Sequence, residues 1–189
     1  MDSKKIEKNF SEHLEVVTEF SSLVEPTGKV AEKIIESFKN GGKVLICGNG
    51  GSAADSNHLA AEFINRYKKD RAPLPAISLV DNSSNLTSIG NDYSFDLVFS
   101  KQVEALATEN DILICISTSG NSKNILEALK KAKEKKVFTI LFTGKSGGEA
   151  ASKCDLVLKV PSDNTPRIQE IHLILYHSIC ELVEEEFSE

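Results

Sequence analysis

Residues 43–66, KVLICGNGGSAADSNHLAAEFINR, restrict the fold of this chain more than any other segment. The short apolar run at residues 44–47 is typical of a buried strand, and the pattern becomes helical from Ala53 onward. Between them lies a glycine-rich turn, residues 48–52, called the first turn below. A strand, a glycine-rich turn and a helix direct backbone N–H groups at an anion on the helix N-terminus. The segment therefore predicts an α/β fold with a phosphate-binding turn, although many α/β domains use such a turn only to reverse the chain.

The helix after the first turn carries a histidine and a glutamate, His58 and Glu62, four residues apart. Residues at this spacing lie on one face of a helix, one above the other. Most pairs of this kind are exposed polar pairs. Beside a phosphate-binding turn, however, the pair suggests proton or metal chemistry on a phosphorylated substrate.

A second strand, turn and helix occur later in the chain. Residues 111–117, DILICIS, form a continuous apolar run that is typical of a fully buried parallel strand, and a helical pattern covers residues 123–135. The second turn, residues 117–122, offers four hydroxyls to a phosphate: Ser117, Thr118, Ser119 and Ser122. A Ser/Thr-rich helix cap is the alternative reading, but a cap needs only one hydroxyl.

The apolar segments alternate with helical ones, which predicts an α/β fold with a parallel sheet covered by helices on both faces. The expected strands are residues 44–47, 76–80, 111–117, 137–143 and 155–160. A single doubly wound domain with five strands in the flavodoxin-like order 2-1-3-4-5 has its switch point between the first and third strands. Both turns would then face one crevice, which suits a phosphosugar.

Helices are expected at both ends of this core. Residues 6–24 have the periodicity of an amphipathic helix that ends before Pro26 and Gly28, and residues 29–39 predict a second helix. Residues 1–40 therefore form a helical extension before an α/β core of residues 43–189. The extension packs on the sheet or on another subunit; the pattern does not decide which. The remaining expectations are a short helix followed by a turn at residues 90–93, an amphipathic segment at residues 95–107 and a long final helix at residues 167–186.

Composition narrows the function classes. The formal net charge of -6 argues against a broad surface for nucleic acid or an anionic membrane. No apolar run approaches the roughly 20 residues that a membrane span needs, and the N-terminus lacks an apolar signal core, so the cytoplasm is the expected location. The four cysteines have no CxxC spacing and are expected to be buried, reduced and free of metal. The basic loop at residues 66–71 is read as a solvated loop, or as a means of steering an anionic substrate.

Several motifs together resemble a known family. They are CGNGGSAAD followed by His58 and Glu62, GNDY at residues 90–93, ISTSGNS at residues 116–122 followed by Asn124, and RIQE at residues 167–170 followed by a histidine. In this order and spacing they resemble the sugar-isomerase (SIS) domain family, and within it the bacterial sedoheptulose-7-phosphate isomerases, also called phosphoheptose isomerases. The resemblance covers nearly the whole chain.

The resemblance implies the isomerisation of sedoheptulose 7-phosphate to D-glycero-D-manno-heptose 7-phosphate, the first step toward activated heptose for surface polysaccharide such as lipopolysaccharide or capsule. It also implies a homotetramer with active sites at subunit interfaces and one Zn²⁺ per subunit. The substrate-binding residues that it implies are Asn49, Gly50, Gly51, Ser52, Glu62, Asn91, Asp92, Ser117, Thr118, Ser119, Ser122 and Gln169. The implied metal ligands are His58, Glu62, Gln169 and His177.

These residue types fit the implied chemistry. An aldose–ketose exchange moves a proton between adjacent carbons, so it needs a base at carbon and an acid at oxygen. Glu62 is the expected base and His177 the expected acid. A tightly bound Glu62 is not freely available as a base, so one of its two roles would dominate. Gln169 and His177 are eight residues apart, or roughly 12 Å along one helix, so a single metal ion does not easily bind both from one chain.

Other functions remain as alternatives. Some SIS proteins are non-catalytic and bind the DNA replication initiator, but they tend to lack the acidic residue at Glu62 and the histidine at His177. An isomerase of another sugar phosphate is a second alternative. The first turn also matches a dinucleotide fingerprint, yet the acidic residue expected about 20 residues further on for a nicotinamide dehydrogenase is absent.

Overall fold

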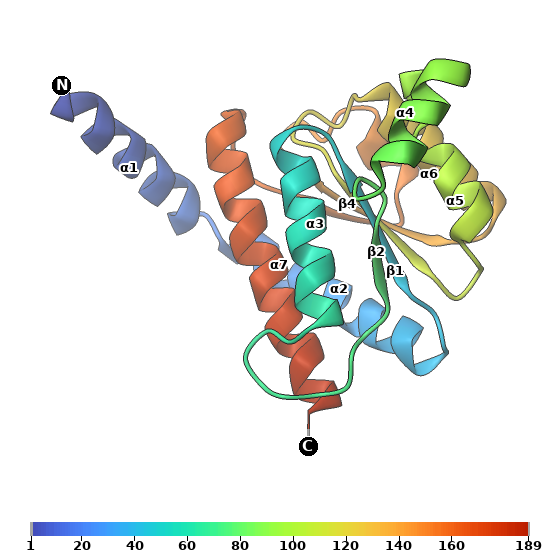
Figure 1. Cartoon of the computed structure of the whole chain (residues 1–189). Coiled ribbons are helices and arrows are strands. Elements are labelled where there is room, and N and C mark those ends of the chain that lie inside the picture. Colours follow the sequence, from blue (N-terminus) through green and yellow to red (C-terminus); the bar gives the residue numbers. More distant parts are fainter. Residues whose placement is uncertain (1, 189) are drawn as a thin grey trace.

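The computed structural model describes residues 2–188 (Figure 1). In chain order its elements are α1 (Ser3–Thr18), α2 (Ser21–Lys39), β1 (Val44–Gly48), α3 (Gly51–Ile64), β2 (Ala76–Ser78), α4 (Ser83–Asp92), η1 (Phe95–Leu97), α5 (Ser100–Leu106), β3 (Ile112–Ile116), α6 (Lys123–Glu134), β4 (Phe138–Thr143), η2 (Ala150–Lys153), β5 (Leu156–Lys159) and α7 (Thr165–Phe187). The strands form one parallel sheet in the order β2-β1-β3-β4-β5. The predicted α/β fold and strand order are confirmed.

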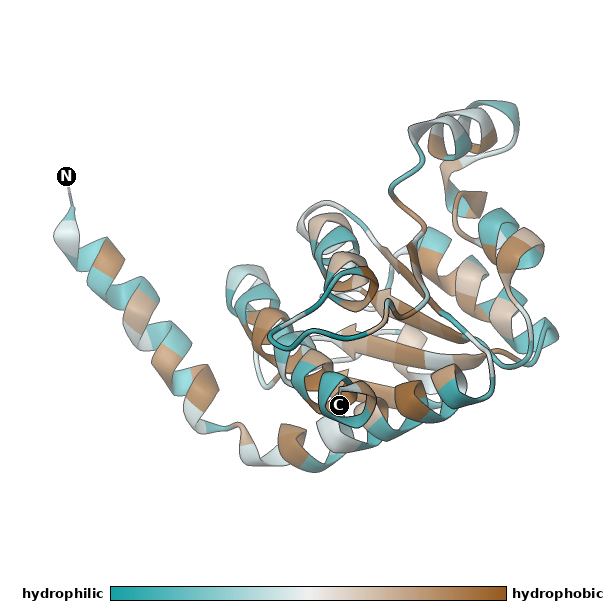
Figure 2. Cartoon of the chain, turned by 60° about the horizontal axis from the view of Figure 1, so that its bottom comes forward, coloured by the Kyte–Doolittle hydropathy of each residue, from teal (hydrophilic) through white to brown (hydrophobic). Residues whose placement is uncertain are grey.

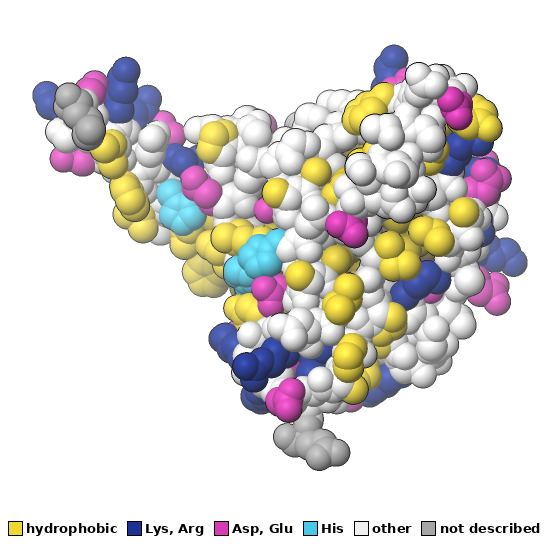
Figure 3. Space-filling view, in the orientation of Figure 1, with side chains coloured by type: hydrophobic (Ala, Val, Ile, Leu, Met, Phe, Trp, Pro, Cys, Tyr) yellow, Lys and Arg dark blue, Asp and Glu magenta, His cyan; other side chains and the backbone are white. Residues whose placement is uncertain are grey.

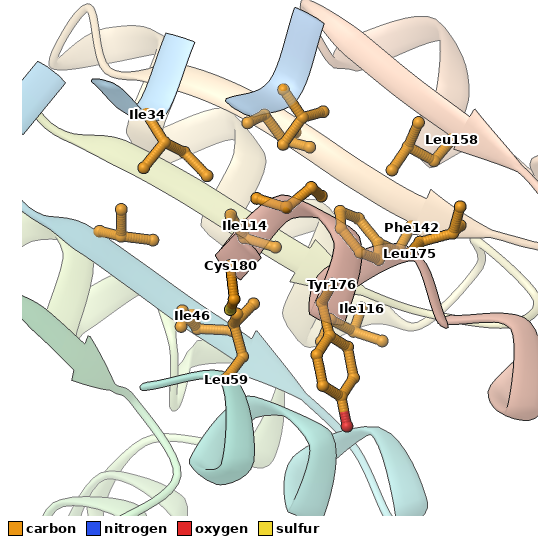
Figure 4. Close-up of a cluster of buried hydrophobic side chains, with 14 of the residues drawn as sticks. Ile34, Ile46, Leu59, Ile114, Ile116, Phe142, Leu158, Leu175, Tyr176 and Cys180 are labelled. Carbon is orange, nitrogen blue, oxygen red and sulfur yellow. The ribbon is translucent and has the colours of Figure 1, made fainter. Parts of the chain in front are cut away.

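The sheet is buried on both faces, which explains why its strands are continuously apolar rather than alternating. In β1, Val44 and Ile46 point into a core formed with α2, α3 and α7. Leu45 and Cys47 point to the other face, into a core formed with α5 and α6. Figure 4 shows part of the first core, where α7 lies over the strands. On this face, α3 from the first half of the chain and α7 from its end pack on the same strands, so their side chains can meet.

The predicted end of the first helix is wrong. The chain turns at Glu19 and Phe20, and α2 continues through Pro26 and Gly28 to Lys39. An interior proline costs a helix roughly 3 kcal/mol. Burial of an aliphatic side chain contributes roughly 1.5–3 kcal/mol, and α2 buries several, among them Leu23, Val30 and Ile34. Packing on the sheet and on α7 therefore outweighs the local preference to end the helix before proline.

The two N-terminal helices have different surroundings. The side chains of α2 lie in the core that α7 also covers, whereas α1 has no buried residue and extends away from the body (Figures 1 and 2). Hydrophobic residues nevertheless recur along α1, and Ile6, Phe10 and Leu14 are exposed. Of the two helices in the extension, α2 packs on the sheet, whereas the apolar side chains of α1 stay exposed in a single chain.

Two smaller boundaries also differ from the prediction. Residues 90–93 were expected to form a turn, but Gly90, Asn91 and Asp92 continue α4 to its end. Asn82 caps this helix by accepting a hydrogen bond from the backbone N–H of Asn85 at 3.1 Å, which helps a polar segment to remain helical. The amphipathic segment at residues 95–107 is divided into η1 and α5. No helix in residues 2–188 is long and apolar enough to cross a membrane.

Candidate functional site

The first and second turns lie side by side at the carboxyl edge of the sheet. They follow β1 and β3, which are neighbours at the switch point, with Gly48 in register with Ile116. The side-chain amides of Asn49 and Asn124 hydrogen-bond to each other in both directions at 2.9 Å, which ties the first turn to α6. The two turns are therefore neighbours at the switch point, as the predicted strand order requires.

The first turn presents backbone N–H groups at the start of α3. Gly50 has a φ of 58°, a conformation that glycine adopts without strain, and it makes no side-chain cap. At the start of α3 the backbone N–H groups of Ser52 and Ala53 donate to the carbonyl oxygens of Asn49 at 3.0 Å and Gly50 at 3.1 Å. The N–H of Gly51, ahead of them, is the donor that this helix start can offer to an anion. Ser52, predicted to contact substrate, is buried in this structure, with only 3% of its surface exposed.

The hydroxyls of the second turn have two kinds of surroundings. The backbone N–H of Gly120 donates to Oγ of Ser117, and that of Asn121 donates to Oγ of Ser119, both at 3.2 Å. These two hydroxyls shape the turn. Ser122, by contrast, is the N-cap residue of α6 and its hydroxyl makes no capping hydrogen bond. Its oxygen and the N-terminus of α6 remain available to a phosphate.

A second cluster lies further along α3, where α7 crosses it. His58, Glu62 and His177 each offer one ligand atom, and these three atoms lie within 4.8 Å of one another. His58 Nε2 is 2.9 Å from Glu62 Oε1. We call these three residues the His–Glu–His group. Two imidazole nitrogens and a carboxylate oxygen form a donor set that transition-metal ions bind well, so the group fits a metal ion.

The His–Glu–His group is partly open to solvent. Figure 3 shows histidine and acidic side chains together on the face over α3 and α7, with basic side chains gathered beside them. Two tyrosine rings flank His177: Tyr67, with its centroid at 5.4 Å, and Tyr176, with its centroid at 4.9 Å. The group therefore has aromatic walls and an open side for a ligand.

Burial, with a smaller contribution from the neighbouring His58, lowers the pKa of His177 below its usual value. The imidazole is then neutral at pH 7, which leaves a lone pair on one nitrogen and a proton on the other. Burial also raises the pKa of Asp55, one turn before His58, and that of the Tyr176 hydroxyl. A neutral His177 suits both metal binding and donation of an N–H hydrogen bond to a substrate oxygen.

The basic loop after α3 is held by one carboxylate of α7. Glu184 accepts hydrogen bonds from the backbone N–H groups of Tyr67 at 2.7 Å, Lys68 at 2.7 Å and Lys69 at 2.8 Å. Burial acts to raise the pKa of Glu184, but these hydrogen bonds and the charge of Arg71 outweigh it and lower the pKa. The loop was read as solvated from the sequence, yet its backbone is anchored, and this anchor places Tyr67 against His177.

The remaining predicted site residues lie elsewhere in the chain. Gln169 rests against the first turn, since a Cβ atom at Gly51 would be 2.5 Å from its Nε2. It lies two helical turns along α7 from His177, as the spacing along the helix requires. Asn91 and Asp92 are exposed at the end of α4, and Nδ2 of Asn91 donates to Oδ1 of Asp92 at 2.9 Å. One chain therefore has two separate clusters: Gln169 lies beside the two turns, and His58, Glu62 and His177 lie together further along α3 and α7.

Four residues of the site had no role assigned from the sequence: Tyr67, Asn124, Tyr176 and Glu184. Asn124 follows the ISTSGNS motif, and this is the only local sequence feature that points to any of the four. The others act through contacts with segments more than a hundred residues away, such as Tyr67 with Glu184. Periodicity and short motifs in the sequence do not predict contacts between segments so far apart.

Known proteins similar to this chain share both its sequence and its fold. Residues 8–144 match the family description "SIS domain". The chain is 52% identical over 182 residues to Phosphoheptose isomerase 1 of Campylobacter jejuni, a match that covers 96% of this chain and 98% of that protein. It is also 52% identical over 179 residues to a phosphoheptose isomerase of Clostridium acetobutylicum, covering 95% of this chain and 91% of that protein.

Two solved structures are similar over almost the full length. The phosphoheptose isomerase GmhA from Neisseria gonorrhoeae superposes with a TM-score of 0.91 at 44% identity, covering 97% of this chain and 99% of that chain. A phosphoheptose isomerase from Francisella tularensis superposes with a TM-score of 0.95 at 37% identity, covering 98% of this chain and 99% of that chain. The similarity therefore extends beyond the sheet to the helices at both ends.

Proposed function

Because the chain belongs to the SIS domain family, we propose that it is a phosphoheptose isomerase that converts sedoheptulose 7-phosphate to D-glycero-D-manno-heptose 7-phosphate. One observation carries the proposal: relatives with this name are about half identical to the chain over nearly the full length of both proteins. The two turns and the His–Glu–His group agree with it, since they provide an anion site and acid–base groups in one chain.

The phosphate binds between the first and second turns. Backbone N–H groups at the start of α3 and α6, together with the Ser122 hydroxyl, donate to its oxygens. His58 lies seven residues beyond Gly51, or about 10 Å along α3. An extended heptose phosphate spans a comparable distance, so its carbonyl end reaches the His–Glu–His group. Gln169, beside Gly51, faces the sugar between the two sites.

Glu62 and His177 move the protons of the reaction. The Glu62 carboxylate removes a proton from carbon 1 of the ketose, and the electron pair forms the double bond of an enediol. A ring N–H of His177 donates to the oxygen on carbon 2. Return of the proton from Glu62 to carbon 2, with transfer of the proton on the oxygen of carbon 1 back to His177, gives the aldose and restores both residues. Proton count and charge are then the same before and after the reaction.

The proposed cofactor is one Zn²⁺ per subunit, held by the His–Glu–His group, with Glu62 as its weakest ligand because this carboxylate also acts as the base. The fit rests on the donor set: the ligand atoms of His58, Glu62 and His177 converge within 4.8 Å, and His177 is neutral at pH 7. A bound zinc ion supplies a Lewis acid that polarises the substrate carbonyl. Gln169 joins as a fourth ligand only if a second subunit brings it there, because in one chain it lies at the first turn.

We place the enzyme in the cytoplasm as a homotetramer with active sites between subunits, where it supplies heptose for a surface polysaccharide such as lipopolysaccharide or capsule. Exposed apolar side chains of α1, α2 and α7 support assembly: Phe10, Phe20, Val24, Ile174 and Leu182. Several of them line one groove between α2 and α7. A groove lined by exposed apolar side chains is typical of a surface that another protein covers.

An NMR time course of sedoheptulose 7-phosphate with the purified protein tests the function. Wild type is expected to form the aldose with added Zn²⁺ and to lose activity with a chelator. Glu62→Gln and His177→Ala are expected to form the aldose roughly 10²- to 10⁴-fold more slowly, whereas the exposed control Glu32→Gln behaves as wild type. A folded protein that converts nothing under any metal condition contradicts the proposal. It would instead favour a non-catalytic SIS protein, and a search for protein partners would follow.

A further inference from the structure

Tyr176 occupies an unusual position between the core and the site. Its ring is fully buried in the core that α2, α3 and α7 share, yet its hydroxyl reaches out of that core toward α3 (Figure 4). The hydroxyl oxygen is 3.0 Å from Nδ1 of His58. A phenylalanine would fill the same space in the core, so the packing alone does not account for the hydroxyl.

The hydroxyl completes a chain of polar contacts through one imidazole. Nδ1 of His58 faces Tyr176 at 3.0 Å, and Nε2 of the same ring faces Glu62 Oε1 at 2.9 Å. The His58 side chain is 44% exposed, and its ring makes edge contacts with the rings of Tyr176, at a centroid distance of 5.5 Å, and His177, at 5.2 Å. Two directional contacts on opposite edges of the ring fix both its position and its rotation.

We propose that Tyr176 is a positioning residue, whose hydroxyl holds the His58 imidazole by Nδ1 so that Nε2 faces Glu62 and His177 as a metal ligand. The proposal rests on the metal site of the proposed function. Metal-binding histidines are generally oriented by a hydrogen bond to the ring nitrogen that does not bind the metal. Here that partner is a tyrosine from another helix, so α7 supplies both His177 and the support for His58 on α3.

A hydroxyl suits this place because it both donates and accepts. Without a metal ion, Tyr176 donates to Nδ1 while the Nε2–H group of His58 donates to the Glu62 carboxylate. When Nε2 binds a metal ion, the proton is on Nδ1, and the N–H donates to the Tyr176 oxygen. Rotation of one O–H bond therefore accommodates both states without movement of the ring.

The zinc affinity of Tyr176→Phe tests the proposal, because this variant removes the hydroxyl and keeps the ring. Competition with a chromogenic chelator gives the zinc Kd of the full-length protein without any assay of turnover. Loss of an outer partner of a metal-binding histidine weakens metal binding by about 10- to 100-fold, and we expect this for Tyr176→Phe. The control Tyr93→Phe removes an exposed tyrosine hydroxyl at the end of α4 and leaves the zinc Kd unchanged.

A spectroscopic signature separates positioning from packing. The visible absorption of Co²⁺ in the site reports ligand geometry. It is expected to change in Tyr176→Phe and not in Tyr93→Phe. In turnover, Tyr176→Phe is expected to lower kcat at saturating zinc more than it raises KM, since the phosphate-binding turns are untouched.

The outcomes distinguish this inference from the proposed function. If His58→Ala loses zinc binding while Tyr176→Phe keeps the wild-type zinc Kd and Co²⁺ spectrum, the positioning role is wrong and the metal site stands. If wild type and His58→Ala bind zinc equally, the metal site itself is wrong and the positioning role falls with it. Weaker zinc binding and a changed spectrum in Tyr176→Phe alone among the tyrosine variants support the inference.

Discussion

In the function proposed above, the two turns and the His–Glu–His group bind their ligands by different means. The turns use backbone N–H groups and hydroxyls at the ends of two adjacent strands, so their geometry follows from the sheet order. The His–Glu–His group uses three side chains on two helices, and it exists only because α7 packs against α3. In the turns, many donors share the binding of one ligand. In the His–Glu–His group, each of three side chains is needed. Substitutions in the two regions should therefore differ in both size and kind.

The largest effect is expected for Glu62→Gln. The amide keeps the shape of the side chain but cannot accept a proton from carbon, and general acid–base catalysis contributes roughly 10²- to 10⁴-fold to rate. The kcat should fall by this factor while KM changes little, because the turns still bind the phosphate. Steady-state kinetics at saturating zinc measures the two constants. A large rise in KM with little change in kcat would remove the distinction between the two regions.

The next largest effect is expected on stability, at Glu184, which holds the loop at residues 67–69 beside the His–Glu–His group. Glu184→Gln replaces a buried carboxylate that accepts three backbone hydrogen bonds, and hydrogen bonds to a charged group contribute roughly 1.5–3 kcal/mol each. Because the amide oxygen still accepts, we expect the free energy of unfolding to fall by about 2 kcal/mol at pH 7. Urea unfolding at equal protein concentration measures it, with the exposed Glu185→Gln as control.

The difference in unfolding free energy between wild type and Glu184→Gln should depend on pH, and the direction follows from the pKa of Glu184. The pKa of Glu184 is lowered in the folded protein from its ordinary value of 4.5. Its contribution is therefore fully present above pH 4.5 and is lost as the pH falls toward the folded-state value. The stability difference between wild type and Glu184→Gln should shrink in that range. A difference that grows on acidification would contradict the role of this carboxylate as a charged acceptor.

A smaller effect is expected in the second turn. Ser122→Ala removes one donor to the phosphate, while the N-terminus of α6 and the other hydroxyls remain. We expect KM for the sugar phosphate to rise about tenfold with kcat nearly unchanged, the inverse of Glu62→Gln. Ser11→Ala, on α1, serves as the matched control. Equal losses of kcat and kcat/KM would mean that the turn acts in the transition state and not in binding alone.

The smallest effect concerns Gln169, which lies between the two regions. In one chain it contacts Gly51, so Gln169→Ala should raise KM by a few-fold and leave the zinc Kd as in wild type. Kinetics and chelator competition on the same preparation measure both quantities. Weaker zinc binding would show instead that an assembled partner brings Gln169 to the His–Glu–His group, and the division between the regions would then hold only within one chain.

Local sequence predicted much of this molecule because many of its features are local. The strand order follows from alternating strands and helices with right-handed crossovers, and the two glycine- and serine-rich turns then have to meet at the switch point. The pairing of His58 with Glu62 follows from the helical repeat alone. The helix boundaries at residues 19–28 and 90–93 failed because local signals from proline, glycine and asparagine were weaker than packing or capping.

The sequence by itself determined the α/β fold, the meeting of two glycine- and serine-rich turns after the first and third strands, and one face of a helix with a histidine and a glutamate. Only the tertiary structure decided that His177 joins this face while Gln169 does not, that α2 is buried while α1 remains exposed, and that Tyr176 and Glu184 support the site from behind. The physical reason is one of range. Backbone geometry and helical periodicity act over a few residues, whereas burial and side-chain hydrogen bonds depend on which distant segments the folded chain brings into contact.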